Sequence, residues 1–211
     1  KFIGDALMAF WNAPLDVKDH REKAIHCGRK MFHLLAKLNN EVMEEGLEEL
    51  KIGVGINTGD VVVGNMGSDQ RFDYTCLGDA VNLSSRLEGQ TKEYRVGIIV
   101  GEETTKGIED RFNFVELDKI AVKGKKEGVR IFTILDDTSR CANGGDVKHH
   151  NTFLSFYRKQ HWNRALKMID LNEITYPELK GYYEMMRERI KTLKVNRPGK
   201  GWDTIYRATS K

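Results

Sequence analysis

The sequence has few cysteines, no long apolar run and little net charge, and each shortage excludes a class of protein. Its three cysteines, Cys27, Cys76 and Cys141, are an odd number without Cys-x-x-Cys spacing. This argues against a disulfide framework or a zinc knuckle and indicates a reducing compartment such as the cytoplasm. Apolar runs such as residues 96–100 are far shorter than the roughly 20 residues of a membrane span. The net charge of +3 is too small to indicate a nucleic-acid partner.

The composition indicates a soluble globular protein with two parts. The 211 residues are 40% hydrophobic and 31% charged, which allows one full-sized domain and a smaller appendage. Residues 1–136 carry 19 lysines and arginines against 23 acidic residues, whereas residues 137–211 carry 15 against 8. We therefore predict a first domain over 1–136, a linker over 137–150 and a helical, tetratricopeptide-like extension over 151–211. Such an extension cannot bury its apolar face alone, so we expect it to dock on the first domain.

The chain begins with lysine inside an expected strand, without a signal peptide. We therefore expect it to be a piece of a longer protein, in which membrane-anchored or sensor regions could lie upstream.

Apolar spacing and turn residues predict an α/β sandwich with a mostly antiparallel sheet and helices on one face. Gly4 and Asp5 predict a tight hairpin, and residues 57–60 predict a second hairpin that joins strands over 50–56 and 61–63. Residues 64–69 are expected to form a loop, and Asp79 to cap a helix that reaches about residue 90. The other expected elements are helices over 19–45 and 102–107, strands over 72–77, 96–100, 112–122 and 129–135, and two or three helices after residue 150.

Four groups of polar residues are candidates for chemistry, although each has an ordinary structural explanation. Asp5 at a tight turn suits Mg²⁺, which prefers oxygen ligands, but aspartate also simply forms turns. Asn82 and Arg86, four apart on one helix face, suit a sugar oxygen and a phosphate, but such a face is usually only solvated. Thr75 offers a hydroxyl, and Lys123 offers a point charge for a polyphosphate. A strand threonine and a solubilising basic hairpin are the alternatives for these two.

Two further features are expected to be structural. His149 and His150 have no other ligands nearby at metal spacing, so we expect a flexible linker pair rather than a metal site. An aromatic cluster follows them without a basic groove, so we expect it to form a docking core rather than a platform for bases. Its members are Phe153, Phe156, Tyr157 and Trp162.

Taken in order, four sequence blocks resemble the catalytic domain of class III nucleotide cyclases. They are KFIGDALMAF from Lys1, GINTGDVVVG from Gly55, YTCLGDAVNLSSRLE from Tyr74 and VKGK from Val122. The resemblance covers residues 1 to about 135, and the block from Tyr74 is its most specific part. The end of the chain, from Gly201, resembles the C-terminal extension of some bacterial adenylate cyclases. The implied fold is a ferredoxin-like α/β sandwich of the nucleotide cyclase type with a helical tail.

This resemblance implies an adenylate cyclase of intracellular signal transduction, which converts ATP into 3′,5′-cyclic AMP and pyrophosphate. Two Mg²⁺ or Mn²⁺ ions in each active site serve the in-line attack of the ribose 3′-hydroxyl on the α-phosphorus. Asp5 matches one of the two metal-binding aspartates of the family. The other aspartate, and the phosphate loop after it, are not found in this sequence. We therefore expect the 211 residues alone to be inactive.

The resemblance also assigns roles to nucleotide-binding residues. Lys1 and Thr75 match the pair that recognises adenine, and Asn82 matches the residue that orients the ribose. Arg86 matches the arginine that stabilises charge on the α-phosphate, and Lys123 the lysine that contacts the terminal phosphates. A lysine only donates, which suits the adenine N1 acceptor, and a threonine can accept from N6. We therefore expect ATP; a guanylate cyclase, which typically has Glu and Cys at these two positions, is an alternative.

A head-to-tail homodimer is the third implication of the resemblance. The metal-binding aspartates then come from one subunit and the nucleotide-binding residues from the other. The loop over 64–71 and the hairpin before it resemble the arm that reaches across to the partner. A second alternative is a catalytically silent, cyclase-like module that only dimerises or binds nucleotide.

Overall fold

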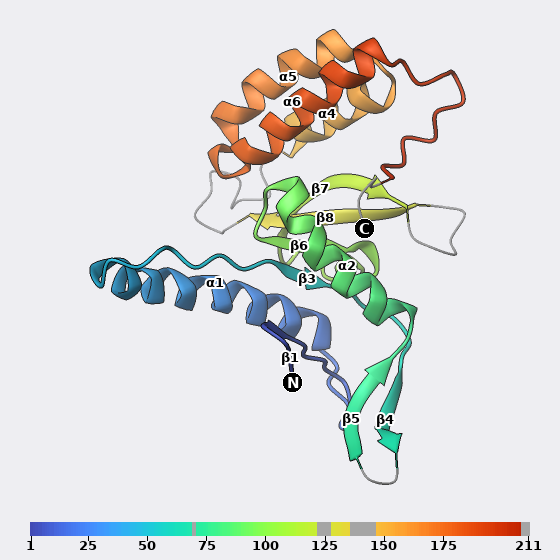
Figure 1. Cartoon of the computed structure of the whole chain (residues 1–211). Helices are drawn as coiled ribbons and strands as arrows, with labels where there is room; N and C mark the ends of the chain where they lie inside the picture. Colours follow the sequence, from blue (N-terminus) through green and yellow to red (C-terminus); the bar gives the residue numbers. More distant parts are fainter. Residues whose placement is uncertain (69–70, 122–127, 136–146, 208–211) are drawn as a thin grey trace.

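The computed structural model describes residues 1–68, 71–121, 128–135 and 147–207, in which helices and strands alternate irregularly (Figure 1). The strands are β1 (Phe2–Ile3), β2 (Ala6–Leu7), β3 (Val54–Ile56), β4 (Val62–Ser68), β5 (Arg71–Leu77), β6 (Ile98–Gly101), β7 (Asn113–Ile120) and β8 (Val129–Leu135). The helices are α1 (His20–Glu44), α2 (Asp79–Tyr94), α3 (Glu102–Thr105), α4 (Lys148–Arg158), α5 (Trp162–Thr175), the 3₁₀ turn η1 (Pro177–Leu179) and α6 (Lys180–Val195).

The strands form one central sheet and two separate hairpins. The central sheet has the order β3-β6-β8-β7, and the hairpins are β1-β2 and β4-β5. Only the β3-β6 pairing is parallel among the described strands; the other pairings are antiparallel. The predicted fold class, an α/β fold with a mostly antiparallel sheet and a helical tail, is therefore confirmed.

One predicted hairpin was wrong. Strand β3 does not pair with β4; it runs parallel to β6, and β4 pairs with β5 over the register Val62↔Leu77 to Ser68↔Arg71. Residues 64–68, which were expected to form a loop, therefore belong to β4. The turn residues at 57–60 favoured a hairpin. The actual partner of β3 is β6, a parallel strand that follows α2 in the chain, and no local sequence signal indicates such a distant pairing.

Helices cover both faces of the central sheet. Along β6, Ile98 and Val100 belong to an apolar core that contains Ile25 of α1, whereas Ile99 belongs to a core that contains Leu87 of α2. Because successive strand residues point to opposite faces, α1 covers one face and α2 the other. The expectation that the helices lie on one face was wrong. In a strand buried on both sides nearly every residue is apolar, so the sequence does not show which residue faces which helix.

The extension docks on the same face as α2, and Figure 1 shows its helices stacked above β7 and β8. The Tyr182 hydroxyl donates to the Leu117 carbonyl of β7 at 2.7 Å, and Arg158 of α4 pairs with Glu116. The aromatic cluster of the extension forms the docking core as expected, with Phe153 and its neighbours buried. His150 is not part of a flexible linker, because it is fully buried in α4.

The β4-β5 hairpin projects from the rest of the chain as an arm (Figure 1). Several of its apolar side chains are exposed to solvent; Val62 is 69% exposed and Phe72 is 65% exposed. The neighbouring β1-β2 hairpin is also open, with Phe2 82% exposed. Apolar patches of this kind mark surfaces that bind other proteins. Within the described residues, no helix combines the length and the apolar character that crossing a membrane requires.

Candidate nucleotide site

Asp5 lies at the tip of the first hairpin. Strands β1 and β2 pair Ile3 with Ala6, so Gly4 and Asp5 alone make the turn, and Gly4 has φ +62°. That left-handed conformation favours glycine, as in tight two-residue hairpins. The Asp5 side chain is therefore exposed and free to meet a cation from outside the hairpin.

The donor set at this turn suits Mg²⁺. Among the described residues, no group of three His, Cys, Asp or Glu side chains is arranged to hold a metal ion. However, Mg²⁺ that assists phosphate chemistry usually takes only one or two carboxylates and completes its shell with water and substrate phosphates. One exposed carboxylate on a rigid turn fits that pattern.

Lys1 is attached to strand β5 two residues away from Thr75. The Lys1 ammonium donates to the Asp73 carboxylate of β5. Asp73 and Thr75 are two residues apart and so face the same side of the strand. Thr75 is buried at 9% exposure, opposite Gly64 of β4. Cys76 points to the other side of the strand, and burial raises the pKa of its thiol.

Asp73 is a further residue beside the candidate site that the sequence pattern does not indicate. It anchors Lys1 across 72 positions of sequence, and no spacing rule predicts so distant a pair. The available signal was weak: Asp73 shares the face of a predicted strand with Thr75.

Asn82 and Arg86 lie on the first turns of α2, which begins two residues after β5 ends. Both side chains are exposed, and within the described part of the chain neither makes a hydrogen bond or an ion pair. Leu83 and Leu87, one position further along in each case, are buried in the core. This spacing presents an amide and a guanidinium together on the outer face of the helix. Asp79 does not cap α2, because Gly78 occupies that position and Asp79 is the first helical residue.

Close packing against β3 fixes the position of α2. A side chain at Gly55 would collide with the α2 backbone at Ser84 and Glu88. The Ser84 hydroxyl donates to the Gly55 carbonyl at 2.9 Å, and the Asn57 amide donates to the Ala80 carbonyl at 3.0 Å. The backbones of α2 and β3 are therefore in direct contact, and this contact fixes the position of Asn82 and Arg86 relative to the sheet.

Two features lie apart from this arrangement. Lys123, the expected phosphate contact, lies outside the described residues.

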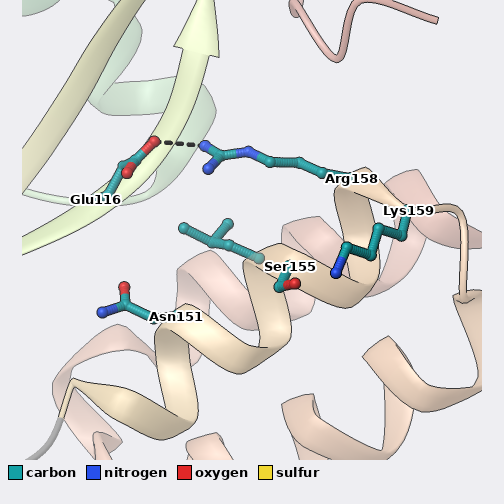
Figure 2. Close-up of a pocket in the computed structure, with 6 residues that line it drawn as sticks. Glu116, Asn151, Ser155, Arg158 and Lys159 are labelled. Atoms are coloured by element: carbon teal, nitrogen blue, oxygen red, sulfur yellow. Dashed lines mark hydrogen bonds and ion pairs between the residues drawn. The ribbon is translucent and has the colours of Figure 1, made fainter.

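An open hollow of about 440 Å³ lies between β7 and α4 (Figure 2). In Figure 2 Arg158 points across it to Glu116, while Asn151 and Ser155 line the α4 side. None of its lining residues belongs to the elements that carry Lys1, Thr75 or Asn82, so we assign it no part in the candidate site.

The comparisons with known proteins all point to nucleotide cyclases. A family model described as the adenylate and guanylate cyclase catalytic domain matches these residues. Adenylate cyclase 1 of Rhizobium meliloti (strain 1021) is 33% identical over 135 residues, which are 64% of this chain and 20% of that protein. The terminal-differentiation-specific adenylate cyclase of Dictyostelium discoideum is 30% identical over 205 residues, 92% of this chain and 10% of that protein. The chain thus spans a small part of these relatives.

Solved cyclase structures are also similar to this chain. The adenylyl cyclase CyaB from P. aeruginosa superposes with a TM-score of 0.60 at 36% identity, covering 64% of this chain and 70% of that one. The guanylyl cyclase Cya2 gives a TM-score of 0.52 at 32% identity, covering 62% of this chain and 66% of that one. Both kinds of cyclase are therefore similar to this chain in fold and in sequence.

Proposed function

The chain belongs to the family of adenylate and guanylate cyclase catalytic domains, and we propose that it is the catalytic part of an adenylate cyclase. Its reaction converts ATP into 3′,5′-cyclic AMP and pyrophosphate: the ribose 3′-oxygen bonds to the α-phosphorus, its proton leaves, and the bond to the β-phosphate oxygen breaks. The observation that carries this proposal is the continuous array formed by β5 and α2. Thr75 of β5 and Asn82 and Arg86 of α2 supply a hydroxyl, an amide and a guanidinium, and Lys1 is attached to β5 by its ion pair with Asp73.

Adenine recognition follows from the donors and acceptors on β5. A lysine ammonium has three N–H donors and no acceptor. The bond to Asp73 uses one donor of Lys1 and leaves two for the adenine N1 acceptor. The Thr75 hydroxyl can accept from N6. Guanine presents a donor at N1, which the Lys1 ammonium cannot accept, so Lys1 facing N1 matches guanine poorly.

The outer face of α2 then supplies the groups for ribose and phosphate. The Asn82 amide orients the ribose, so that its 3′-hydroxyl faces the α-phosphorus. Negative charge grows on the equatorial oxygens as the new bond forms, and the Arg86 guanidinium stabilises that charge. Because this interaction strengthens in the transition state, Arg86 should act on kcat more than on substrate binding.

Divalent cations complete the proposed site. Asp5 would hold Mg²⁺ or Mn²⁺ together with the substrate phosphates. Two such ions, when bound, would activate the 3′-hydroxyl and neutralise charge on the β- and γ-phosphates. The second family aspartate is not found in the 211 residues, so we propose that these residues alone are inactive and that the natural gene product is the active form. We also propose that this domain lies in the cytoplasm, where its proposed substrate ATP is available.

A head-to-tail homodimer would assemble the complete site. The open apolar side chains of the β4-β5 arm and the β1-β2 hairpin support a partner chain at this end of the molecule. In such a dimer Asp5 of one subunit meets Arg86 of the other, so each dimer holds two sites.

A direct assay tests the proposed activity. The natural gene product containing this chain is incubated with Mg²⁺ or Mn²⁺ and either ATP or GTP, and the cyclic nucleotide is measured. We expect cyclic AMP and little cyclic GMP. Preferred formation of cyclic GMP would establish the guanylate cyclase alternative, and absence of both products would establish a catalytically silent module.

Mixing two inactive variants tests the dimer. Asp5→Ala and Arg86→Ala should each be nearly inactive alone. A mixed dimer would contain one intact site, because the unmodified Asp5 and the unmodified Arg86 meet there. Equal mixing should therefore restore about a quarter of the normal activity. No restoration in a mixture shown to exchange subunits would exclude a shared site.

A further inference from the structure

The C-terminal end of α2 is attached to the C-terminal extension by polar links on two sides. The Tyr206 hydroxyl donates to Glu93 Oε1 at 3.0 Å. Two residues along, Arg95 Nη1 donates to Glu184 Oε2 of α6 at 3.1 Å. The residue between them, Tyr94, is fully buried. The extension therefore contacts α2 at the end opposite to its nucleotide-facing residues.

Arg189 of α6 occupies the centre of this attachment. Its Nη1 donates to Asp118 Oδ2 of β7 at 2.5 Å, and the Tyr94 hydroxyl donates to the same oxygen at 2.8 Å. The guanidinium carbon also lies 3.9 Å from the centre of the Tyr206 ring and 5.3 Å from that of Tyr94. The Asp118 residue is only 1% exposed and the Arg189 side chain 11%. Removing one partner from so buried a pair is strongly unfavourable, because it leaves an uncompensated buried charge.

Helix α2 connects this cluster rigidly to the candidate site. Tyr94 follows Arg86 by eight residues, about 12 Å along the axis at 1.5 Å per residue. Leu83 and Leu87, which follow the two nucleotide-facing residues, belong to the same apolar core as the helices of the extension. Because cores of this kind are close-packed, a shift at one end of α2 reaches the other.

We propose that Arg189 is a positioning residue, through which the C-terminal extension holds α2 at the place where Asn82 and Arg86 meet the ribose and the α-phosphate. This inference rests on the proposed function, because it takes the roles of those two residues from there. A misplacement of about 1 Å can lower a rate by up to about 10²-fold. Adenine is recognised from β5 and not from α2, so loss of Arg189 should lower kcat and leave KM nearly unchanged.

The variant that tests this is Arg189→Met in the natural gene product, with Arg187→Met as its matched control. Arg187 lies on the same helix and makes two ion pairs, with Asp170 at 2.8 Å and Glu173 at 2.9 Å. Both partners belong to α5, so the control weakens the extension without touching α2. Arg189→Lys keeps the charge but loses the planar group that stacks on the rings.

Two readouts separate positioning from general damage. Arg189→Met should lower kcat for ATP about 10-fold with KM within about 2-fold, and Arg189→Lys should recover part of that loss. Hydrogen exchange of the amides in 79–94 should accelerate in Arg189→Met. Arg187→Met should leave kcat and the exchange of α2 within about 2-fold of the unmodified protein. The ratio of ATP to GTP use should not change in any variant.

A milder variant covers the case in which Arg189→Met does not fold. Tyr94→Phe keeps the buried ring and removes only the donor to Asp118, so kcat should fall about 3-fold, as for one lost hydrogen bond. The proposal is overturned if kcat stays unchanged in folded Arg189→Met and Tyr94→Phe, or if Arg187→Met lowers kcat equally. An unmodified gene product without cyclase activity would instead overturn the proposed function. The exchange measurement would then decide alone whether Arg189 holds α2.

Discussion

His150 should make the fold less stable as the pH falls from about 6.5 to about 4. Its ring is fully buried, with Nε2 2.6 Å from the Glu116 carbonyl oxygen and Nδ1 2.8 Å from the Tyr183 hydroxyl. A carbonyl only accepts, so Nε2 carries the hydrogen and Nδ1 accepts from Tyr183. Burial lowers the pKa of His150 from 6.5 to about 4; the Glu116 carbonyl opposes this shift and Arg158 adds to it.

The sign and size of the effect follow from proton binding. Above pH 6.5 the imidazole is neutral in both the folded and the unfolded chain, so it adds no pH dependence. Between pH 6.5 and pH 4 only the unfolded chain binds the proton, and the free energy of unfolding falls as the pH is lowered. A shift of this size corresponds to about 3 kcal/mol at most, at 1.36 kcal/mol per pKa unit. Below pH 4 both states are protonated and the loss is complete.

Urea unfolding at pH 7 and at pH 4.5 measures this loss. His150→Gln removes the titrating group and keeps an amide that can donate to Glu116, so it should lose about 2–3 kcal/mol less than the unmodified chain between the two pH values. His149→Gln is the matched control, because His149 is the adjacent residue and is exposed. If His150→Gln and His149→Gln show the same pH dependence as the unmodified chain, the buried neutral imidazole is not what destabilises the fold in acid.

Three further predictions concern the site and its support. Arg86→Ala should lower kcat about 10²–10³-fold with little change in KM for ATP; steady-state kinetics check this, and a rise in KM with normal kcat would contradict the transition-state role. Lys1→Glu combined with Thr75→Cys should raise GTP use relative to ATP, and an unchanged ratio of the two rates would remove the assignment of base recognition. Gly55→Ala should lower the free energy of unfolding by about 1–3 kcal/mol, because the new Cβ pushes α2 away from β3. Equal urea midpoints for Gly55→Ala and the unmodified chain would show that α2 is not tightly seated.

Local signals predicted much of the secondary structure. The apolar spacing placed a helix over 19–45, and α1 spans His20–Glu44. Strands expected over 112–122 and 129–135 correspond to β7 and β8, which pair as predicted. The turn at Gly4 and Asp5 also forms as expected. In each case the deciding interactions join neighbouring residues, so periodicity and turn chemistry were sufficient.

Contacts between distant residues account for what the sequence did not predict. The parallel pairing of β3 with β6 depends on the α2 crossover, and the local turn signal pointed to β4 instead. The pairing of Lys1 with Asp73 depends on how the first hairpin lies against β5. Motif spacing identified Thr75, Asn82 and Arg86 as candidates because those residues lie on one short strand-helix unit. The same spacing did not identify Asp73, whose carboxylate binds the Lys1 ammonium.

The extension shows why a family match and a folding unit need not end at the same residue. The match ends at residue 136, yet Leu117 and Ile131 of the sheet share one apolar core with Phe153 and Tyr182 of the extension. From sequence alone His149 and His150 are equivalent, but docking buries one and leaves the other exposed. The sheet face on which the extension docks is therefore completed by residues beyond the region that the family model matches. Because α2 packs into this same core, the stability of the candidate site depends on a segment that contributes none of its candidate residues.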